Sequence, residues 1–159
     1  AADGVPPPTA LETVATYSRA FASQDLDALA RLSHPILVLR AGGRVAYREQ
    51  MKDAFAELHR AGAVLEEEVR GSPTAMFESG RTRAFAVPVL RKTEQFVTPL
   101  AYVVISYDAG ATWTVFDLLC TDNRWLKAAL PTYEGVPDLL PVHPDAPKSV
   151  EEAIRAPDR

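Results

Sequence analysis

The decisive stretch of this sequence reads Ser106-Tyr107-Asp108-Ala109-Gly110-Ala111-Thr112-Trp113. It lies between the runs 96–107 and 112–120, which are the longest and most apolar of the β-prone segments. We therefore expect it to form the turn of a long antiparallel hairpin. Three helix-like segments come earlier in the chain. Helices followed by a series of antiparallel strands indicate an α+β fold rather than an all-β one.

The turn follows the pattern S-x-D-x-G-x-T-W, and it resembles the Asp-box of the sialidase propellers. In such a turn the Asp108 carboxylate can accept backbone N–H bonds, Gly110 can adopt a positive φ, and Trp113 can cover the turn. Sialidases repeat this motif around a propeller, and one copy in 159 residues cannot build one. The motif is therefore interpreted as a turn brace.

Apolar residues at helical spacing predict three helices before the hairpin. The first spans about Leu11–Ala22. Asp25 caps the second, short helix, which Ser33-His34-Pro35 ends because a residue before proline avoids the α conformation. The third spans about Arg48–Arg60, and Gly62 suits its C-terminal cap.

The other segments are predicted to be mostly strand. Ile36–Leu39 is a short β-prone run. Further strand candidates span 64–69, 74–78 and 82–91, with their pairing left open, and a last helical turn is expected within 125–130. Pro88 should mark an edge strand or a bulge. The run Glu66-Glu67-Glu68 suits a solvated face.

Length and proline content indicate one domain with two arms. We predict an extended N-terminal arm at 1–8, a folded domain at 9–130 and a proline-rich tail at 131–159. The start Ala1-Ala2-Asp3-Gly4 is typical of a secreted or periplasmic protein after removal of a signal peptide, with a cytoplasmic protein as the alternative.

Composition disfavours several classes of function. The net charge is −4 without a basic block, which argues against nucleic-acid binding, and no apolar run reaches the roughly 18 residues of a membrane span. Cys120 is the single cysteine and is interpreted as a small buried hydrophobe. The three histidines share no metal-ligand spacing, so neither a metal nor another cofactor is expected.

The order of elements resembles the NTF2-like superfamily of cystatin-like α+β cones, in particular its SnoaL-like branch. The residues that carry this resemblance lie in the first two helices: Tyr17, Phe21, Asp25, Leu26, Leu29 and Leu32. The resemblance implies three helices packed on a curved antiparallel or mixed sheet, with a pocket at the open end of the cone. Members include isomerases, dehydratases, cyclases and binding proteins, so it implies a pocket and leaves the reaction open.

Asp117 is the foremost candidate for chemistry, because it is an acid within an apolar strand and is predicted to face the same side as Trp113 and Val115. With Tyr17 it could form an acid–base pair, since burial raises the pKa of a carboxyl group. The alternatives for Asp117 are a salt bridge to an arginine on a neighbouring strand and a position where that face of the sheet meets solvent. For Tyr17, the alternative is a core ring with a hydrogen-bonded hydroxyl.

The remaining candidates are ligand-binding residues. Tyr102 could orient a ligand, with the same alternative as Tyr17. Phe55 and Trp113 could supply apolar walls, and Arg40, expected at the end of a short strand, could bind an acidic group unless it is simply exposed.

Three functions stay open at this point. The first is a domain that binds a small apolar molecule in the cone pocket. The second is an isomerase- or dehydratase-type enzyme that uses Asp117 with a tyrosine. The third is a non-catalytic module that forms a homodimer through its sheet. A water-filled pocket containing Asp117 would favour the enzyme, and a filled cone with Asp117 in a salt bridge would favour the other two.

Overall fold

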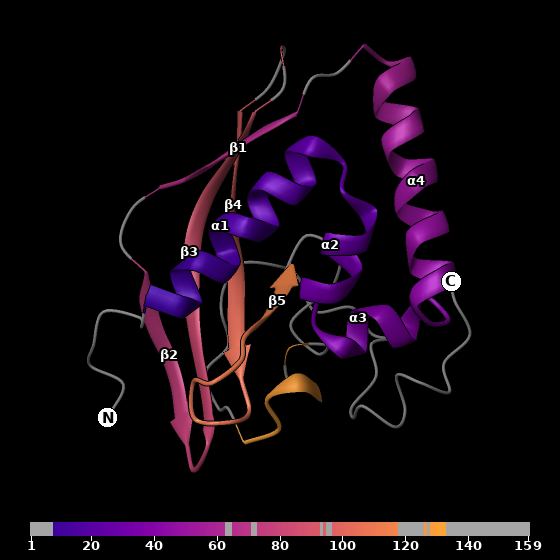
Figure 1. Cartoon of the computed structure of the whole chain (residues 1–159). Helices are drawn as coiled ribbons and strands as arrows, with labels where there is room; N and C mark the ends of the chain where they lie inside the picture. The colour runs from indigo at the N-terminus through magenta and orange to yellow at the C-terminus, as the bar shows by residue number, and fades with distance from the viewer. Residues whose placement is uncertain are drawn as a thin grey trace.

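The computed structural model describes residues 8–62, 65–70, 73–92, 94, 97–117, 126 and 128–132. Within them, four helices precede a five-stranded antiparallel sheet (Figure 1), which confirms the predicted α+β class. Residues 1–7 of the predicted arm and 133–159 of the predicted tail lie outside the described part. The elements are α1 (Pro8–Ser23), α2 (Leu26–Leu32), α3 (Pro35–Arg40), α4 (Arg44–Arg60), β1 (Glu66–Val69), β2 (Thr74–Ser79), β3 (Thr82–Lys92), β4 (Val97–Ser106) and β5 (Thr114–Asp117).

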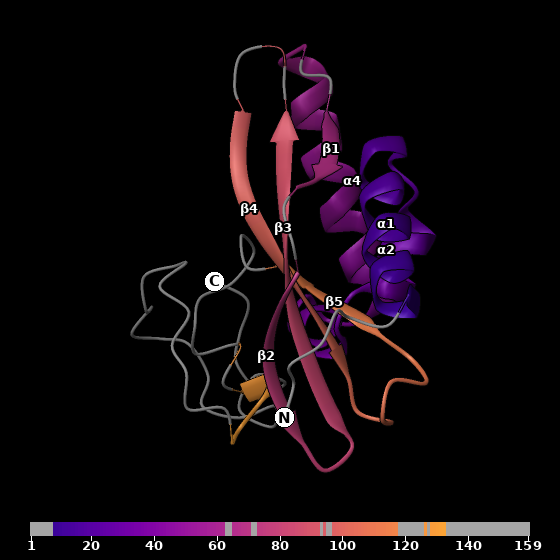
Figure 2. The same cartoon turned by 90° about the vertical axis from the view of Figure 1, so that its left-hand side faces the viewer.

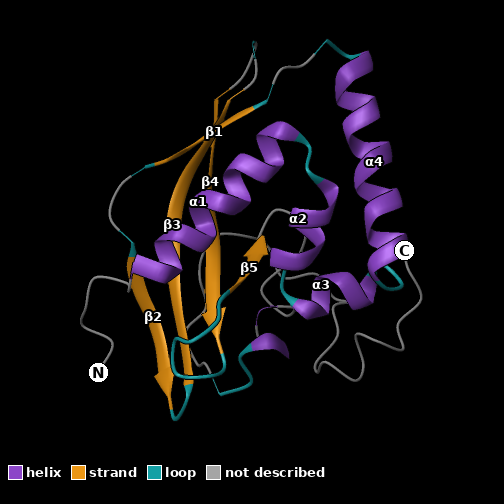
Figure 3. Ribbon diagram, in the orientation of Figure 1, coloured by secondary structure: helices purple, strands orange, loops and turns teal. Residues whose placement is uncertain are grey.

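The strands are ordered β1-β3-β4-β5, and β2 also pairs with β3. This arrangement resolves the pairing of the segment before β3. Glu66–Val69 of β1 pairs with one half of β3, and Thr74–Ser79 of β2 pairs with the other half. The two short strands thus share one long neighbour, and Figure 3 shows them as separate arrows along it.

Pro88 was predicted to mark an edge strand or a bulge, but it lies inside the central strand β3, in continuous register with β4. It occupies the break between the partners β1 and β2. At this break, Arg70 N–H donates to the Pro88 carbonyl at 2.8 Å. A residue of an antiparallel strand directs its N–H and C=O to the same neighbour. An N–H at this position would therefore face Arg70, just after the end of β1.

Side chains on both faces of the sheet are buried. Helices α1, α2 and α4 cover one face, and the short turn around Leu126–Ala129 lies on the other (Figure 2). The helix-facing cluster includes Tyr17, Tyr102 and Val104, and the opposite cluster includes Val103. The predicted last helical turn is confirmed by the bond from Leu130 N–H to the Leu126 carbonyl, at 2.8 Å.

The segment predicted as a β-prone run, Ile36–Leu39, belongs to helix α3 instead. Pro35 stands in the first turn, where a proline ring suits helix entry. The His34 imidazole accepts a hydrogen bond from Ile36 N–H at 3.1 Å and so caps the helix. Short apolar runs do not distinguish a buried helix from a buried strand, and here the cap decides.

The other helices follow the predicted pattern with longer bounds. Asp25 caps α2 by accepting from Ala28 N–H at 3.1 Å, as predicted. Helix α4 begins at Arg44, four residues before the predicted Arg48, because Gly43 at φ 107° starts it. Gly62 follows its C-terminus with φ 72°, which fits the predicted cap.

Candidate functional site

Four polar side chains form a buried group, called here the ionic cluster: Glu67, Arg91, Tyr102 and Asp117. Arg91 Nε donates to Glu67 Oε2 at 2.8 Å, and Arg91 Nη2 donates to the Tyr102 hydroxyl at 3.1 Å. Tyr102 in turn donates to the Glu67 carboxylate, whose oxygens lie 2.7 and 2.6 Å away. Asp117 Oδ2 lies 3.7 Å from Arg91 Nη2, at salt-bridge distance.

The strand register brings these four residues together. Glu67 of β1 is opposite Arg91 of β3, and Tyr102 of β4 is opposite Asp117 of β5. Since Tyr102 is also opposite Val87, and Val87 lies four residues before Arg91, period-two alternation places all four side chains on the helix-facing side. The ionic cluster therefore joins four strands.

Burial makes the cluster electrostatically demanding. The side chains of Glu67 and Asp117 are 0% and 3% exposed, and that of Arg91 is 18% exposed. Burial opposes the charge of Arg91, but Tyr102, Asp117 and Glu67 together raise its pKa above the ordinary value. Burial, followed by the charges of Asp117 and Glu67, also raises the pKa of Tyr102. The phenol therefore stays protonated and acts as a hydrogen-bond donor.

Aromatic rings enclose the cluster from the helix side. The Tyr17 ring of α1 meets the Tyr102 ring edge-on, with centroids 5.0 Å apart. The Arg91 guanidinium lies over the Phe21 ring, 4.2 Å from its centroid, in a cation–π contact. Phe21 also meets Phe55 of α4, at 5.3 Å. A continuous series of rings thus leads from the cluster to helix α4.

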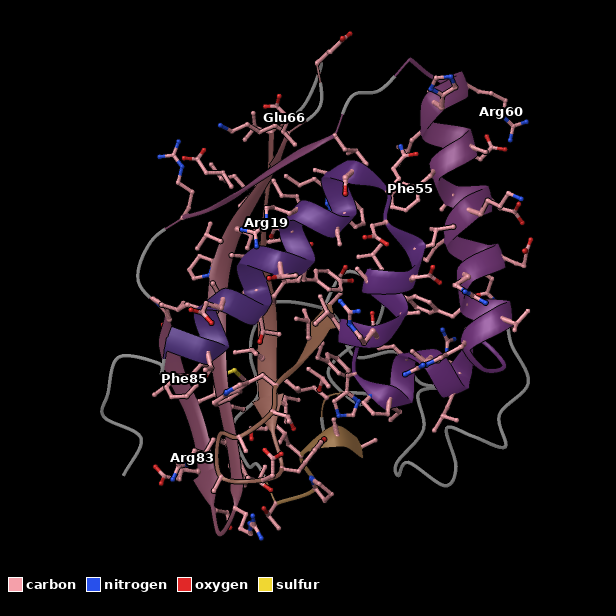
Figure 4. All side chains as sticks on the ribbon, in the orientation of Figure 1. Arg19, Phe55, Arg60, Glu66, Arg83 and Phe85 are labelled. Carbon is pink, nitrogen blue, oxygen red and sulfur yellow. The ribbon has the colours of Figure 1, made fainter. Side chains whose placement is uncertain are left out.

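Phe55 also lines an open groove of about 400 Å³, which is called here the α4 groove. Six residues line it, from the α1–α2 turn and from α4: Gln24, Leu26, Lys52, Phe55, Ala56 and His59. Figure 4 shows Phe55 in the space between α4 and the end of α1. Lys52, Phe55, Ala56 and His59 recur at intervals of three and four along α4, so they form one stripe on the helix.

Gln24, which lines the groove, has an unusual backbone conformation. Its φ is 59°, in the left-handed region that glycine usually occupies after a helix. Asp25 N–H donates to the Ala20 carbonyl at 2.8 Å, and Gln24 N–H donates to the Phe21 carbonyl at 3.3 Å. These are the two bonds of a Schellman motif. The turn thus ends α1 with Gln24 and starts α2 with its cap Asp25.

The structure brings together three of the residues singled out from the sequence. Asp117 and Tyr102 belong to the ionic cluster, and Tyr17 packs against it. Asp117 pairs with an arginine, as its alternative proposed, but Arg91 lies on β3, beyond the neighbouring strand β4. Tyr102 shows the hydrogen-bonded core ring. Phe55 lies apart from them, in the floor of the α4 groove.

Trp113 and Arg40 lie away from the cluster. Trp113 Nε1 donates to the Gly110 carbonyl at 3.1 Å and to Thr9 Oγ1 at 3.2 Å, so it covers the turn and ties it to α1. Arg40 is the last residue of α3, where a strand end was expected, and is half-buried.

Sequence reasoning missed Arg91 and Glu67. The acidic run of β1 was interpreted as a solvated face, and this is wrong for its middle residue: the side chain of Glu67 is fully buried. Successive side chains of a strand point to opposite faces of the sheet. This alternation predicts that Glu67 points to the face opposite to that of its neighbours Glu66 and Glu68. A second signal was Asp117 itself, since a buried acid requires a cation nearby.

Among the described residues, no group of three or more histidine, cysteine, aspartate or glutamate side chains is placed to hold a metal ion. Nor does the described part contain a helix that is long and apolar enough to span a membrane. Comparisons of the sequence with protein-family models and with curated proteins find no match.

Proposed function

We propose that this protein is a ligand-binding domain that holds a small, largely apolar molecule in the α4 groove. The observation that carries the proposal is the groove itself: about 400 Å³ in volume, with Phe55, Leu26 and Ala56 among its lining residues. Small-molecule sites combine an apolar lining with a few polar groups, and they have volumes of roughly 300–1,000 Å³. Gln24, Lys52 and His59 supply the polar groups here.

The proposed framework is an NTF2-like cone. The order of helices before antiparallel strands supports it, as does the cover of α1, α2 and α4 on one face of the sheet. The α4 groove would then correspond to a pocket between the long helix and the first two helices. A homodimer through the sheet and an exported location remain predictions beside this proposal.

An isomerase- or dehydratase-type reaction is the second candidate, because Asp117, Tyr102 and Tyr17 gather on the helix-facing side of the sheet. A general base has to reach its substrate directly or through one water. The Asp117 side chain is only 3% exposed and lies beside Arg91, and the Tyr102 hydroxyl is engaged by Glu67 and Arg91. These contacts favour a structural role for the cluster, and so favour binding over catalysis.

The proposal is tested with N-phenyl-1-naphthylamine, an uncharged apolar dye whose fluorescence rises when it leaves water. Ala56→Trp fills the groove, and Ala54→Trp is its matched control, since Ala54 is an exposed residue of α4 outside the groove. We expect the parent and Ala54→Trp to bind the dye with the same Kd and Ala56→Trp to bind it at least about tenfold more weakly. Equal Kd values for all three proteins, or no binding to the parent, would overturn the proposal.

Asp117→Asn separates the two candidate functions, because it removes the charge and keeps the shape. A binding domain should keep its dye affinity in this variant, since the α4 groove is separated from Asp117 by Phe21. Loss of dye binding by a folded Asp117→Asn variant would instead place Asp117 in the ligand site and favour the isomerase- or dehydratase-type function.

A further inference from the structure

The ionisable side chains that line the α4 groove are all basic. Its six lining residues include Lys52 and His59 but no acidic side chain. The other basic residues in this part of α4 are engaged, since Arg48 pairs with Asp27 and Arg60 pairs with Glu57. Within the described part of the chain, Lys52 makes no ion pair. Lys52 is therefore available at the groove to pair with an anion.

The positions of these groups on α4 suit a molecule with one charged end. Lys52 and His59 are seven residues apart, which corresponds to roughly 10 Å along the helix axis. Phe55 and Ala56 lie between them. A small ligand that contacts Lys52 with its charged end would rest its body on Phe55 and Ala56. The stripe thus offers a cationic end followed by an apolar surface.

Gln24 adds an independent indication from the opposite wall. A non-glycine residue in the left-handed region is sterically strained. Strain of this kind is found preferentially at functional sites. Glycine would suit the backbone at this turn, but only a side chain can reach into the groove. The carboxamide of Gln24 can donate N–H bonds to an anionic oxygen.

From these observations we infer that the ligand of the α4 groove is a small organic anion, with an apolar body on Phe55 and Ala56 and an anionic head group held by Lys52 and Gln24. This inference rests on the proposed function, since it requires the groove to be a binding site. It adds the chemical class of the ligand. A carboxylate and a sulfonate share the chemistry required of the head group.

Two dyes that differ by one charged group test the inference. The probe is 1-anilinonaphthalene-8-sulfonate, an aromatic anion, and the reference is the uncharged N-phenyl-1-naphthylamine. Lys52→Gln removes the proposed anchor, and Arg60→Gln is the control, because it removes a charge from the same helix outside the groove. We expect Lys52→Gln to raise the Kd of the anionic dye by about three- to fivefold, which is the effect of losing an exposed ion pair. The Kd of the uncharged dye should stay the same. Arg60→Gln should change neither.

Salt provides a second readout. Raising sodium chloride from about 0.01 M to about 1 M should weaken binding of the anionic dye to the parent, because salt screens the charge of Lys52. Binding to Lys52→Gln should depend much less on salt. Ala56→Trp should exclude both dyes. If both dyes are excluded by Ala56→Trp but Lys52→Gln affects them equally, the groove is a binding site and the inference about its ligand is wrong. If Ala56→Trp excludes neither dye, the proposed function is wrong and the inference falls with it.

Discussion

At the scale of single residues, His34 is a buried polar group outside the ionic cluster. It is 3% exposed and links three segments. Its Nδ1 accepts from Ile36 N–H at 3.1 Å, and its Nε2 lies 2.5 Å from the Tyr107 hydroxyl, which donates to the Ala129 carbonyl at 2.8 Å. Since the tyrosine hydrogen is used for Ala129, the histidine must donate through Nε2. This arrangement requires the neutral imidazole.

The histidine therefore makes stability depend on pH. Burial lowers the pKa of His34 from 6.5 to about 4. An unfolded chain takes up a proton at the ordinary pKa, whereas the folded protein takes it up only near pH 4. The contribution of neutral His34 to the stability of the fold is thus fully present above about pH 6.5 and is lost as the pH falls towards 4. It amounts to about 3 kcal/mol of unfolding free energy.

Denaturant titrations at several pH values measure this effect. The parent should lose stability over that interval, and His34→Asn, which can still cap α3 but does not titrate, should lose about 3 kcal/mol less. Parallel profiles for the parent and His34→Asn would contradict the assignment.

Gln24 leads to a second prediction at this scale. Gln24→Gly should raise the unfolding free energy by about 0.5–1 kcal/mol, because glycine adopts the positive φ without strain. The same variant should weaken binding of the anionic dye. Ala109→Gly is the matched control, since Ala109 has φ 60° but lies in the hairpin turn. It should stabilise the fold to a similar extent and leave the dye unaffected. A loss of stability in Gln24→Gly would refute the strain argument.

At the scale of elements, the hairpin turn holds the short edge strand β5 against β4. Asp108 Oδ1 accepts from Thr112 N–H at 2.9 Å and from the Ser106 hydroxyl at 2.7 Å, and Gly110 N–H donates to Ser106 Oγ at 2.8 Å. The turn is thus braced as the sequence pattern predicts. Bonds from Thr112, followed by the bond from Ser106, hold the pKa of Asp108 at about 2.

Asp108→Ala removes the brace without touching the groove or the ionic cluster. We expect the melting temperature to fall by a few degrees and the dye affinities to stay unchanged, because the turn positions β5 and contacts no ligand. Asp108→Asn keeps an acceptor oxygen, so its melting temperature should lie between those of the parent and the alanine variant. In the parent, the stabilisation by the Asp108 carboxylate persists above about pH 3.8 and is lost as the pH falls towards 2. An unchanged melting temperature in Asp108→Ala would show that the turn forms without its brace.

At the scale of the whole molecule, the ionic cluster joins β1, β3, β4 and β5 beneath the helices. Arg91→Met leaves Glu67 and Asp117 buried without their cation. We expect this variant to lose about 3–5 kcal/mol of unfolding free energy, as for other broken buried ion pairs. Denaturant unfolding measures it.

Lys92→Met is the matched control for that experiment. Lys92 follows Arg91 on β3 and pairs with Glu68 at the surface, at 2.9 Å. Its loss should be at most about 1 kcal/mol. Combining Arg91→Met with Glu67→Gln should restore part of the lost stability, because one stranded charge is removed as well. Equal losses in the two single variants would mean that the cluster does not stabilise the fold.

The candidate site could be predicted only in part from the sequence. Asp117 stands out because an acid within an apolar strand needs an explanation, and Tyr102 was correctly expected on the adjacent strand. Arg91 could not be assigned to Asp117, since the two strands that carry them are separated by β4. Phe55 was expected in a pocket wall, but its companions in the α4 groove come from a turn whose Gln24 conformation has no clear sequence signal.

The sequence by itself determined the features that depend on neighbours within about four residues. These are the helical periodicity, the Asp25 cap and the braced turn, whose bonds link Asp108 only to Ser106 and Thr112. Tertiary structure alone decided the burial of Glu67 and the composition of the α4 groove. The Glu67–Tyr102 bond joins residues 35 positions apart. Such a contact depends on strand register and helix packing, which local patterns do not specify.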